Sequence, residues 1–561
     1  MLRIKDISKT WHGQSVLNGV SFVLNPNEKI ALVGANGVGK STLLKIIAGL
    51  VNADSGEIEN ISGMDIAYLP QELKLDEALT ISEYVKISIG LADLEKNMEH
   101  LAGDLSSQKS KALYAESQDL YERKKGYSFQ NRLQLMLQGF GMADLQPDRL
   151  ISSLSGGQKN KVALLAVLLQ EVDILLLDEP TNNLDLPAII WLETFLSKTK
   201  VSLIIISHDR FFLDKIADKV VEIDWFKRQA IEFPGTYSRY LVDKQAKLAK
   251  QKQAARLQRE EIKRVLGACR KQKQWALEGA KQTTKDNDKY IRGAQRDRSA
   301  GLASKAKAAE KKLARLERIE IYKERIPLSI PLSDEFDKSR PAIILSGIQA
   351  GYDGRVIIGP LDLQVEYGSR VGILGLNGQG KTVLLKLITR DLQPITGEVK
   401  ISPSLKPGNL MQQHENLDFG ATVIDFILRK VNLPKEDIYN LLNIFNFNFS
   451  AADKKIGDLS PGERARLLFL LFAANSVNAL ILDEPSNHLD LEALAALEEV
   501  LQTYRGTVVF VSHDRYFLDK VHPTKLYQLS RGRLSLITDF DKYLSGLQSQ
   551  AQELFKKIKT N

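Results

Sequence analysis

The chain has 561 residues, of which 43% are hydrophobic and 26% charged, and this ordinary globular composition excludes disordered and fibrous classes. At roughly 150 residues per domain, the length predicts three or four domains. The longest apolar runs have about eight residues, short of the ~20 that span a membrane. The N-terminus lacks the apolar stretch of a secretory signal. We therefore expect a cytoplasmic protein without a membrane domain. The single cysteine, Cys269, excludes an internal disulfide and a multi-cysteine metal centre.

A glycine-rich stretch near the N-terminus recurs in the second half of the chain, and each copy follows an apolar β-type run and opens a helical one. This order is the context of a phosphate-binding loop. Glycines let backbone N–H groups converge on phosphate oxygens, a lysine adds positive charge, and a hydroxyl can be placed on Mg²⁺. The residues expected to hold ATP and Mg²⁺ in this way are Gly34, Asn36, Gly37, Gly39, Lys40, Ser41 and Thr42 in the first copy and Gly375, Asn377, Gly378, Gly380, Lys381 and Thr382 in the second.

Two carboxylates end a buried-strand pattern in each copy. In-line phosphoryl transfer needs one carboxylate for Mg²⁺ and another that polarises the attacking water. We therefore expect Asp178 and Asp483 to bind the metal and Glu179 and Glu484 to be catalytic. The first copy is longer than the second between its phosphate loop and these acids, and we place a helical insertion at about residues 85–125.

The excess positive charge lies between the two copies. From Leu241 to Arg325 there are 25 Lys plus Arg against 11 Asp plus Glu, a net charge of +14, whereas the whole chain carries +8. Small or apolar residues recur every seven positions from Leu241 to Cys269, and at alternating steps of four and three from Leu302 to Leu316. This spacing predicts two helices that pair as an antiparallel coiled coil, with Cys269 packed in the seam.

A Ser-Gly-Gly-Gln segment in the first copy and Ser-Pro-Gly-Glu in the second precede the acid pairs by one common interval, and a histidine follows each pair at another. With these motifs the chain resembles the ATP-binding cassette superfamily over nearly every residue outside the insertion and linker. The resemblance implies an α/β fold: two tandem ATP-binding cassette (P-loop NTPase) domains joined by a basic antiparallel coiled-coil linker. We expect the first cassette at 1–236, the linker at 237–340, the second cassette at 341–545 and a short tail at 546–561.

The resemblance also implies further roles. Trp11 and Tyr352 would stack on adenine, while Gln71 and Gln413 would sense Mg²⁺ as metal ligands. In such cassettes the Ser-Gly-Gly segment of one copy covers the nucleotide of the other. Site one, on the first phosphate loop, and site two, on the second, would each use a switch histidine, His208 and His513 respectively. The covering residues would be Ser155, Gly156, Gly157 and Gln158 for site two and Ser460, Gly462 and Glu463 for site one.

Two positions depart from the usual pattern. Pro461 removes one backbone N–H from the segment that covers site one. Asn183 stands where the second copy has His488. We expect both sites to hydrolyse ATP, with a weaker grip on the nucleotide at site one.

Proteins of transport, DNA repair and translation all use ATP-binding cassette domains, so the fold alone does not identify the process in which this chain acts. The lone cysteine excludes the zinc and iron–sulfur cassette proteins, and no very long coiled coil separates the phosphate loop from the Ser-Gly-Gly segment. What remains resembles the F subfamily, ABC-F. The supporting features are the tandem copies, the insertion in one copy, the Gly235–Leu241 segment before the linker, and Ser-His-Asp-Arg at 207–210 and 512–515.

This resemblance implies a ribosome-binding ATPase that modulates translation, acting as a monomer whose two cassettes pair, with its linker near the peptidyl tRNA. A basic rod suits the phosphate surface of ribosomal RNA. The expected RNA contacts flank the linker tip: Arg270, Lys271, Lys273, Trp275, Arg292, Arg296 and Arg298. Protection from antibiotics at the peptidyl transferase centre is one option within the subfamily and a general translation role the other. The alternatives from other classes are a DNA-associated ATPase acting on branched DNA and a transporter ATPase subunit.

Overall fold

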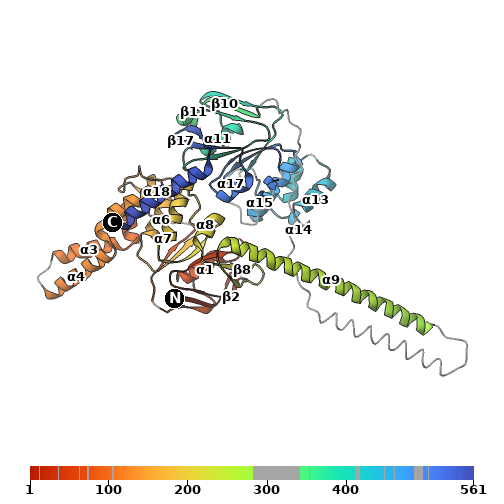
Figure 1. Cartoon of the computed structure of the whole chain (residues 1–561), viewed down its shortest axis with the longest axis horizontal. Helices are drawn as coiled ribbons and strands as arrows, with labels where there is room; N and C mark the ends of the chain where they lie inside the picture. Colours follow the sequence, from red (N-terminus) through yellow and green to blue (C-terminus); the bar gives the residue numbers. More distant parts are fainter. Residues whose placement is uncertain are drawn as a thin grey trace, which may run out of the picture. The chain divides into compact units, whose positions relative to one another are not determined.

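The computed structural model divides the chain into two compact units, one formed by Met1–Tyr237 with Ile326–Asn561 and the other by Ser238–Arg325. The structure describes residues 1–281 and 341–560 except for positions 12, 36, 62, 72–74, 104–106, 353, 411–416, 432, 446, 448, 460, 486–493, 495, 496, 499 and 503. The first unit contains both cassettes, each with one small and one large sheet (Figure 1).

The small sheets are three-stranded and antiparallel, in the orders β2-β1-β4 and β11-β10-β13. Along β1 the buried Leu2 and Ile4 alternate with Arg3 and Lys5, which pair with Glu59 on the neighbouring strand. This alternation is typical of a sheet with one buried face. The strands are β1 (Leu2–Trp11), β2 (Gln14–Leu24), β4 (Ser55–Asn60), β10 (Ile343–Tyr352), β11 (Arg355–Val365) and β13 (Thr396–Ile401).

The large sheets are six-stranded, in the orders β5-β6-β7-β3-β8-β9 and β14-β15-β16-β12-β17-β18. All neighbours are parallel except the last pair in each sheet. The strands are β3 (Lys29–Val33), β5 (Ile66–Leu69), β6 (Ile174–Asp178), β7 (Ser202–Ile206), β8 (Lys219–Ile223), β9 (Ala230–Pro234), β12 (Arg370–Leu374), β14 (Pro407–Leu410), β15 (Ala479–Asp483), β16 (Thr507–Val511), β17 (Lys525–Ser530) and β18 (Arg533–Leu536).

Strands β6 and β15 are buried at every position, as apolar strands covered on both faces are. Since carboxyl ends of parallel strands meet at one edge, the residues that follow β3, β6 and β7 lie together, and so do their counterparts after β12, β15 and β16.

The helices of the first cassette are α1 (Lys40–Ile47), α2 (Ile81–Ser88), α3 (Leu91–Ala102), α4 (Gln108–Arg123), α5 (Phe129–Gly139), α6 (Gly156–Leu168), α7 (Leu186–Lys198) and α8 (Arg210–Ile216). Those of the second are α11 (Lys381–Ile388), α12 (Val423–Lys430), α13 (Lys435–Ile444), α14 (Phe449–Ala452), α15 (Pro461–Ala474), α17 (Arg515–Val521) and α18 (Phe540–Thr560). Short 3₁₀ helices occur at Gly126–Ser128, Ile151–Ser153 and Ile456–Asp458. Helices α3 and α4 pack side by side within the region where we expect the insertion (Figure 1).

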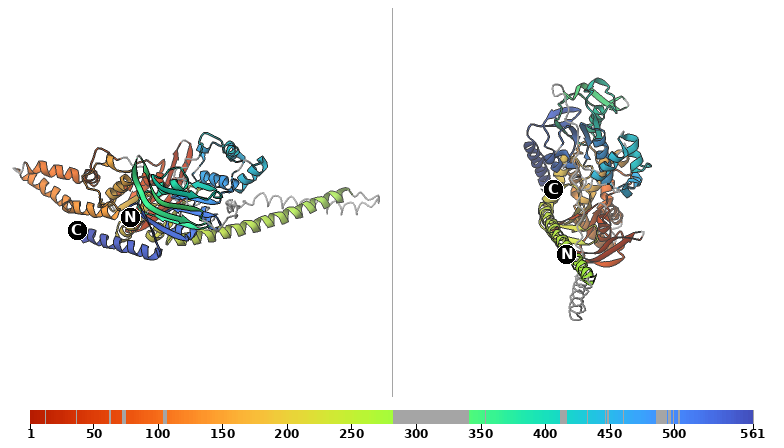
Figure 2. Two further views of the ribbon diagram at one scale, coloured as in Figure 1. Left: turned by 90° about the horizontal axis from the view of Figure 1, so that it is seen from above. Right: turned by 90° about the vertical axis from the view of Figure 1, so that its right-hand side faces the viewer.

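The linker begins with a single long helix, α9 (Tyr237–Lys281), which Figure 2 shows as a continuous rod. Leu241 and Ile262, on the seam expected from the heptad spacing, are half-buried, whereas Lys263 and Arg264 are exposed. The helix expected around Leu302–Leu316 lies outside the described residues, as does the side chain of Cys269.

Helix α18 runs without a break through the residues where we expected a separate tail, and the expected boundary at 545/546 falls inside it. It extends from the second cassette and packs on α7 and α5 of the first (Figure 1). Phe555 of α18 is buried edge-on against Phe195, with ring centroids 5.9 Å apart, and Lys198 lies over the Phe555 ring. In the part of the chain that the structure describes, no helix has the length and apolar content needed to cross a bilayer.

Candidate functional site

Both phosphate loops fold in the same way at the start of a helix. Lys40 Nζ donates to the backbone oxygens of Gly34 at 2.8 Å and Ala35 at 3.1 Å. Lys381 makes the corresponding bonds to Gly375 and Leu376, at 2.8 and 3.2 Å. Each lysine is buried, so its charge is held beside the loop rather than in solvent.

A glycine precedes each of these lysines because no other residue fits there. Gly39 and Gly380 have φ of 103° and 93°, in the left-handed region that favours glycine. A Cβ on Gly39 would lie 2.6 Å from Val16 Cγ1, and one on Gly380 2.3 Å from Ile358 Cγ2. Ser41, Thr42 and Thr382 lie in the first turns of the helices that follow the loops, while Asn36 lies outside the described residues.

The carboxylates expected to bind metal end the central strands β6 and β15. Burial raises the pKa of Asp178 to about 6, although the nearby Ser41 hydroxyl opposes the shift. Burial likewise raises the pKa of Asp483, and the side chain of Thr382 partly offsets this shift. Both carboxylate oxygens of Asp178 and Oδ2 of Asp483 are buried without a hydrogen-bond partner among the described residues.

Such oxygens beside a hydroxyl fit a divalent cation. No cluster of three His, Cys, Asp or Glu that could hold a metal alone occurs among the residues described. Mg²⁺ commonly binds through one or two carboxylates and completes its shell with substrate phosphates and water. The residues present therefore suit Mg²⁺ that arrives with a nucleotide.

The next residue in each copy has a strained backbone. Glu179 and Glu484 have φ of 52° and 46°, which non-glycine residues adopt at a cost and which recurs at functional sites. Their N–H groups donate to Ile206 and Val511, each at 2.9 Å, and so tie both glutamates to the neighbouring strand. The same strain at equivalent positions indicates that the side-chain direction matters in both cassettes.

Each histidine faces the glutamate of its own cassette. His208 Nε2 lies 3.1 Å from Glu179 Oε1, and its backbone N–H donates to Glu179 Oε2 at 3.2 Å. His513 Nε2 lies 3.6 Å from Glu484 Oε1. Burial, aided by the charge of Lys381, lowers the pKa of His513 to about 3 and keeps its ring neutral. Both histidines line one cavity of about 40 Å³.

The two covering segments differ at the start of their helices. Ser155 caps α6, accepting from the Gln158 N–H at 3.3 Å, while Gln158 Oε1 accepts from the Ser155 N–H at 3.0 Å. Gly156 and Gly157 form the first turn, at the helix end that attracts anions. In the other cassette Pro461 is the first residue of α15, which a helix tolerates because the N–H there has no helical acceptor.

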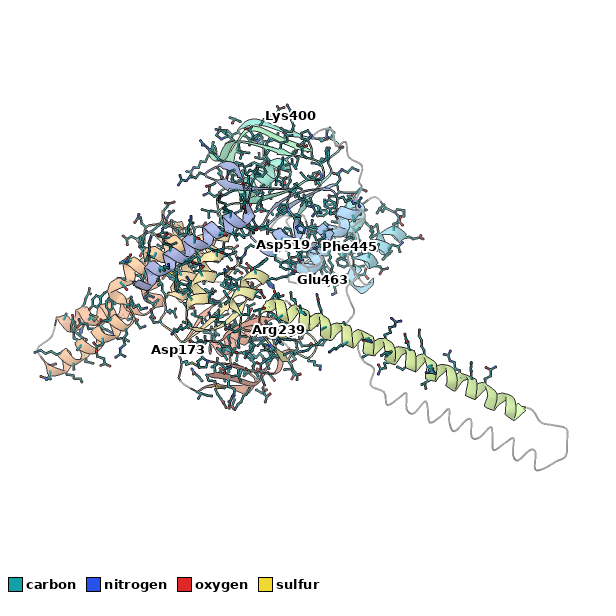
Figure 3. The ribbon with its side chains drawn as sticks, viewed as in Figure 1. Asp173, Arg239, Lys400, Phe445, Glu463 and Asp519 are labelled. Atoms are coloured by element: carbon teal, nitrogen blue, oxygen red, sulfur yellow. The ribbon has the colours of Figure 1, made fainter. Side chains whose placement is uncertain are left out.

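Glu463 lies in the first turn of α15 (Figure 3), and Ser460 lies outside the described residues. Gly462 is the second residue of that helix. The structure therefore describes Ser155, Gly156, Gly157 and Gln158 in full, and the corresponding segment of the second cassette only in part.

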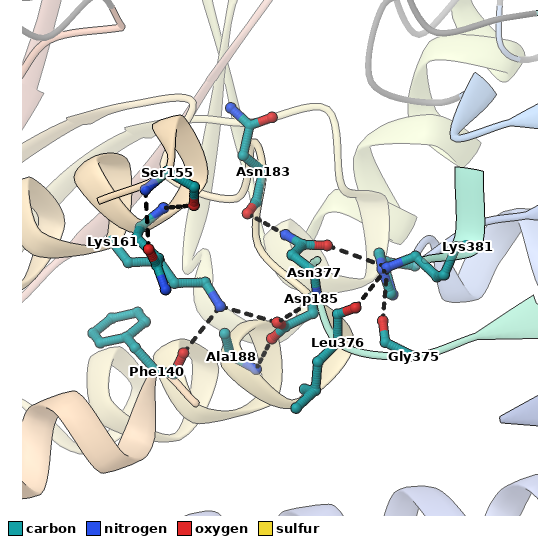
Figure 4. A network of polar contacts seen from close by, with 12 residues as sticks. Phe140, Ser155, Lys161, Asn183, Asp185, Ala188, Gly375, Leu376, Asn377 and Lys381 are labelled. Carbon is teal, nitrogen blue, oxygen red and sulfur yellow. Dashed lines mark hydrogen bonds and ion pairs between the residues drawn. The ribbon is translucent and has the colours of Figure 1, made fainter. Parts of the chain in front are cut away.

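The structure brings the second phosphate loop against the first cassette. Asn377 Nδ2 donates to the Asn183 backbone oxygen at 2.7 Å, and the Asn377 N–H donates to Asp185 Oδ2 at 3.3 Å (Figure 4). Asn377 Oδ1 accepts from Lys381 Nζ at 3.2 Å. Residues of both cassettes thus meet at the second phosphate loop.

Sequence reasoning missed two residues that support this contact. Asp185 caps α7 and forms a buried ion pair of 2.9 Å with Lys161. Although burial opposes ionisation, Lys161 keeps the pKa of Asp185 below its usual value. The sequence did contain a signal for Asp185, because the segment Asn183-Leu-Asp185 has the counterpart His488-Leu-Asp490 after the second acid pair. The second copy of this segment lies outside the described residues.

The adenine-stacking candidates are exposed at the ends of equivalent strands. Trp11 ends β1 and is 45% exposed, and Tyr352 ends β10 and is 43% exposed. Gln71 lies in an exposed loop after β5, and Gln413 is outside the described residues. Of the expected RNA contacts, Arg270 and Lys271 are exposed on α9. The described residues do not include Arg292, Arg296 and Arg298, nor the side chains of Lys273 and Trp275.

Comparison with known proteins agrees with this geometry. A family model described as "ABC transporter" matches residues 17–182 and 358–487. ABC transporter F family member 2 of Arabidopsis thaliana is 33% identical over 99% of this chain and 80% of that protein. The energy-dependent translational throttle protein EttA of Escherichia coli (strain K12) is 30% identical, over 94% of this chain and 92% of that protein.

Among solved structures, the complex of archaeal ribosomal stalk protein aP1 and archaeal ribosome recycling factor aABCE1 is similar with a TM-score of 0.58 at 17% identity. The alignment covers 97% of this chain and 92% of that chain. At this identity the likeness shows the fold, and it confirms two cassettes in tandem.

Proposed function

This chain belongs to the ABC-F family of ATP-binding cassette proteins and is an ATPase, and we propose that it acts on the ribosome to modulate translation. The observation that carries the proposal is its similarity to the translational throttle protein EttA, which extends over nearly the full length of both chains. The match includes the linker, the part in which the net positive charge is concentrated.

The linker supplies the physical basis for this proposal. Exposed cations follow one another along α9 at Lys247, Lys250, Arg256, Lys263, Arg264, Arg270 and Lys271. Ribosomal RNA presents a dense phosphate surface, and cations that neutralise phosphates release counterions. We propose that the linker binds ribosomal RNA and approaches the peptidyl tRNA. A more specific version of this proposal is that the bound chain protects the ribosome from antibiotics at the peptidyl transferase centre.

We propose the following roles for the residues of the two ATP sites. Lys40 and Lys381 bind the β and γ phosphates, and Asp178 and Asp483 hold Mg²⁺ with the hydroxyls of Ser41 and Thr382. Bound Mg²⁺ neutralises charge that develops on the phosphate oxygens. Glu179 and Glu484 orient and polarise the attacking water, and the histidine beside each one fixes the glutamate side chain.

The test uses a variant that binds ATP without hydrolysing it. Replacing Glu179 and Glu484 together with Gln keeps their size and removes the charge that activates water. ATP then holds the cassettes together, and the double variant should co-sediment with ribosomes more strongly in ATP than the parent does. Adding Lys40→Ala and Lys381→Ala should abolish this gain. ATP-dependent binding to branched DNA without binding to ribosomes would overturn the proposal and favour the DNA alternative.

A second measurement addresses the linker. If about six cations meet phosphates, ribosome affinity should fall on the order of a thousandfold between 50 and 200 mM salt. Replacing Arg270 and Lys271 with Ser should weaken binding more than replacing Lys400 and Lys557, two exposed lysines outside the linker. Equal effects of the two pairs would show that the linker does not carry the interaction.

A further inference from the structure

Two buried arginines cross between the cassettes in a reciprocal pattern. Arg210 Nη1 of the first cassette lies 2.9 Å from Glu498 Oε2 of the second. Arg515 of the second cassette donates through Nη1, at 3.2 Å, and through Nη2 to the two carboxylate oxygens of Glu193 of the first. The four side chains are between 0% and 9% exposed.

Buried ion pairs of this kind specify geometry more than they stabilise. Desolvation offsets much of their attraction, but losing one partner strands a buried charge, so the pairs favour one arrangement of the two cassettes. Aromatic contacts define the same arrangement: Phe211 and Tyr516 lie 6.1 Å apart, and Arg210 lies 4.5 Å from the centre of the Tyr516 ring.

Each arginine lies in a short hydrogen-bonded segment that also carries the histidine of its own cassette. Arg515 is the first residue of α17 and follows His513 by two positions. Between them, Asp514 caps α17 by accepting from the Tyr516 N–H at 2.8 Å, and its own N–H donates to Ser512 Oγ at 3.1 Å. A shift of Arg515 would therefore be passed to His513.

Helix α7 of the first cassette contacts site two at two places. Its cap, Asp185, accepts from the Asn377 N–H of the phosphate loop. Glu193, about 12 Å further along the helix axis, accepts from Arg515 beside His513. Glu193 also accepts from Lys215 of α8 at 3.3 Å, so its carboxylate is held from both cassettes.

We propose that Glu193 is a positioning residue for ATP hydrolysis at site two, acting through Arg515 on His513 and so on Glu484. Glu498 does the same for site one through Arg210 and His208. Each cassette thereby aligns the catalytic segment of the other without touching the nucleotide. The inference rests on the roles proposed above for the glutamates and histidines, and it does not depend on the ribosome.

The experiment measures the two sites separately. Turnover in a Glu179→Gln background reports site two, and turnover in a Glu484→Gln background reports site one. Glu193→Gln should lower kcat at site two by about tenfold to a hundredfold, as misplacing a catalytic group does, with little change in the KM for ATP. The loss at site one should be at least about tenfold smaller.

Glu498→Gln is the matched control, and its bias should be reversed. Equal losses at both sites, or none, would mean that these pairs only hold the interface together and would overturn the proposal. If Glu193→Gln does not fold, Glu193→Asp keeps the charge and must show the same bias toward site two. The assignment of the sites has its own check, because the Glu179→Gln, Glu484→Gln variant must be inactive; activity there would refute the site roles, whatever Glu193 does.

Discussion

Asn377, in the second phosphate loop, donates through Nδ2 to the backbone oxygen of Asn183 in the first cassette, at 2.7 Å. The accepting atom belongs to the main chain, so the contact does not require an asparagine side chain. The second copy has His488 at the equivalent sequence position. Asn183 has φ of 61°, a conformation that asparagine tolerates better than most residues. The departure noted in the sequence therefore affects backbone strain rather than the ability to form the contact.

Removing the loop lysines should weaken nucleotide binding at each site independently. A hydrogen bond to a charged group contributes about 1.5–3 kcal/mol, so Lys40→Ala or Lys381→Ala should weaken ATP binding at its own site about tenfold to a hundredfold. Equilibrium titration with ATP and steady-state ATPase assays check this. Full ATPase activity in both single variants and in the double variant would show that the site assignment is wrong.

Pro461 gives a way to strengthen site one. Pro461→Ala restores a backbone N–H at the first residue of α15. One hydrogen bond contributes about 0.5–1.5 kcal/mol, so the KM of site one, measured in the Glu484→Gln background, should fall about twofold to tenfold. The mirror variant Gly156→Pro, measured in the Glu179→Gln background, should raise the KM of site two. A gain at site two from Pro461→Ala would contradict the pairing of α15 with site one.

The neutral His513 should make the fold sensitive to acid. Burial lowers its pKa to about 3, whereas an unfolded histidine titrates near about 6.5. The unfolded state then binds a proton that the folded state does not. The contribution of His513 to the free energy of unfolding is fully present above the unfolded pKa and is lost as the pH falls from about 6.5 toward 3.

His513→Asn should therefore reduce the loss of unfolding free energy between about pH 7 and pH 5. Urea unfolding at the two pH values measures this difference. His208→Asn is the matched control, because His208 is the more exposed of the two rings. A pH dependence identical to that of the parent would contradict a buried neutral His513.

The contact between α18 and α7 should contribute to the stability of the paired cassettes. Phe555 is buried against Phe195, so Phe555→Ala should cost about 3–5 kcal/mol in unfolding free energy. Lys557→Ala removes an exposed ion pair with Glu553 on the same helix and should cost much less than Phe555→Ala. Urea unfolding of the two variants makes the comparison, and similar costs would show that α18 does not brace the cassettes.

The sequence alone determined the parts of the site that are contiguous in the chain. Glycines, a lysine and a hydroxyl within a few residues specify a phosphate loop, because the backbone there can take one conformation at the start of a helix. The apolar runs before Asp178 and Asp483 specify strands, and each strand delivers its acid to one edge of the sheet. Repetition of these motifs was sufficient to predict two cassettes.

Only the tertiary structure decided which residues of one cassette meet the other. Asn377 and Asp185 are separated by 192 positions, and Arg515 and Glu193 by 322. A local pattern indicates that such a residue is charged or polar, but its partner depends on how whole surfaces pack. The same reason hid the packing of α18 on α7: the sequence predicts only a short tail at 546–561, and the surface that covers this segment lies far away in the chain. The left-handed φ of Glu179 and Glu484 likewise depends on the fold, because the neighbouring strand holds each N–H in place.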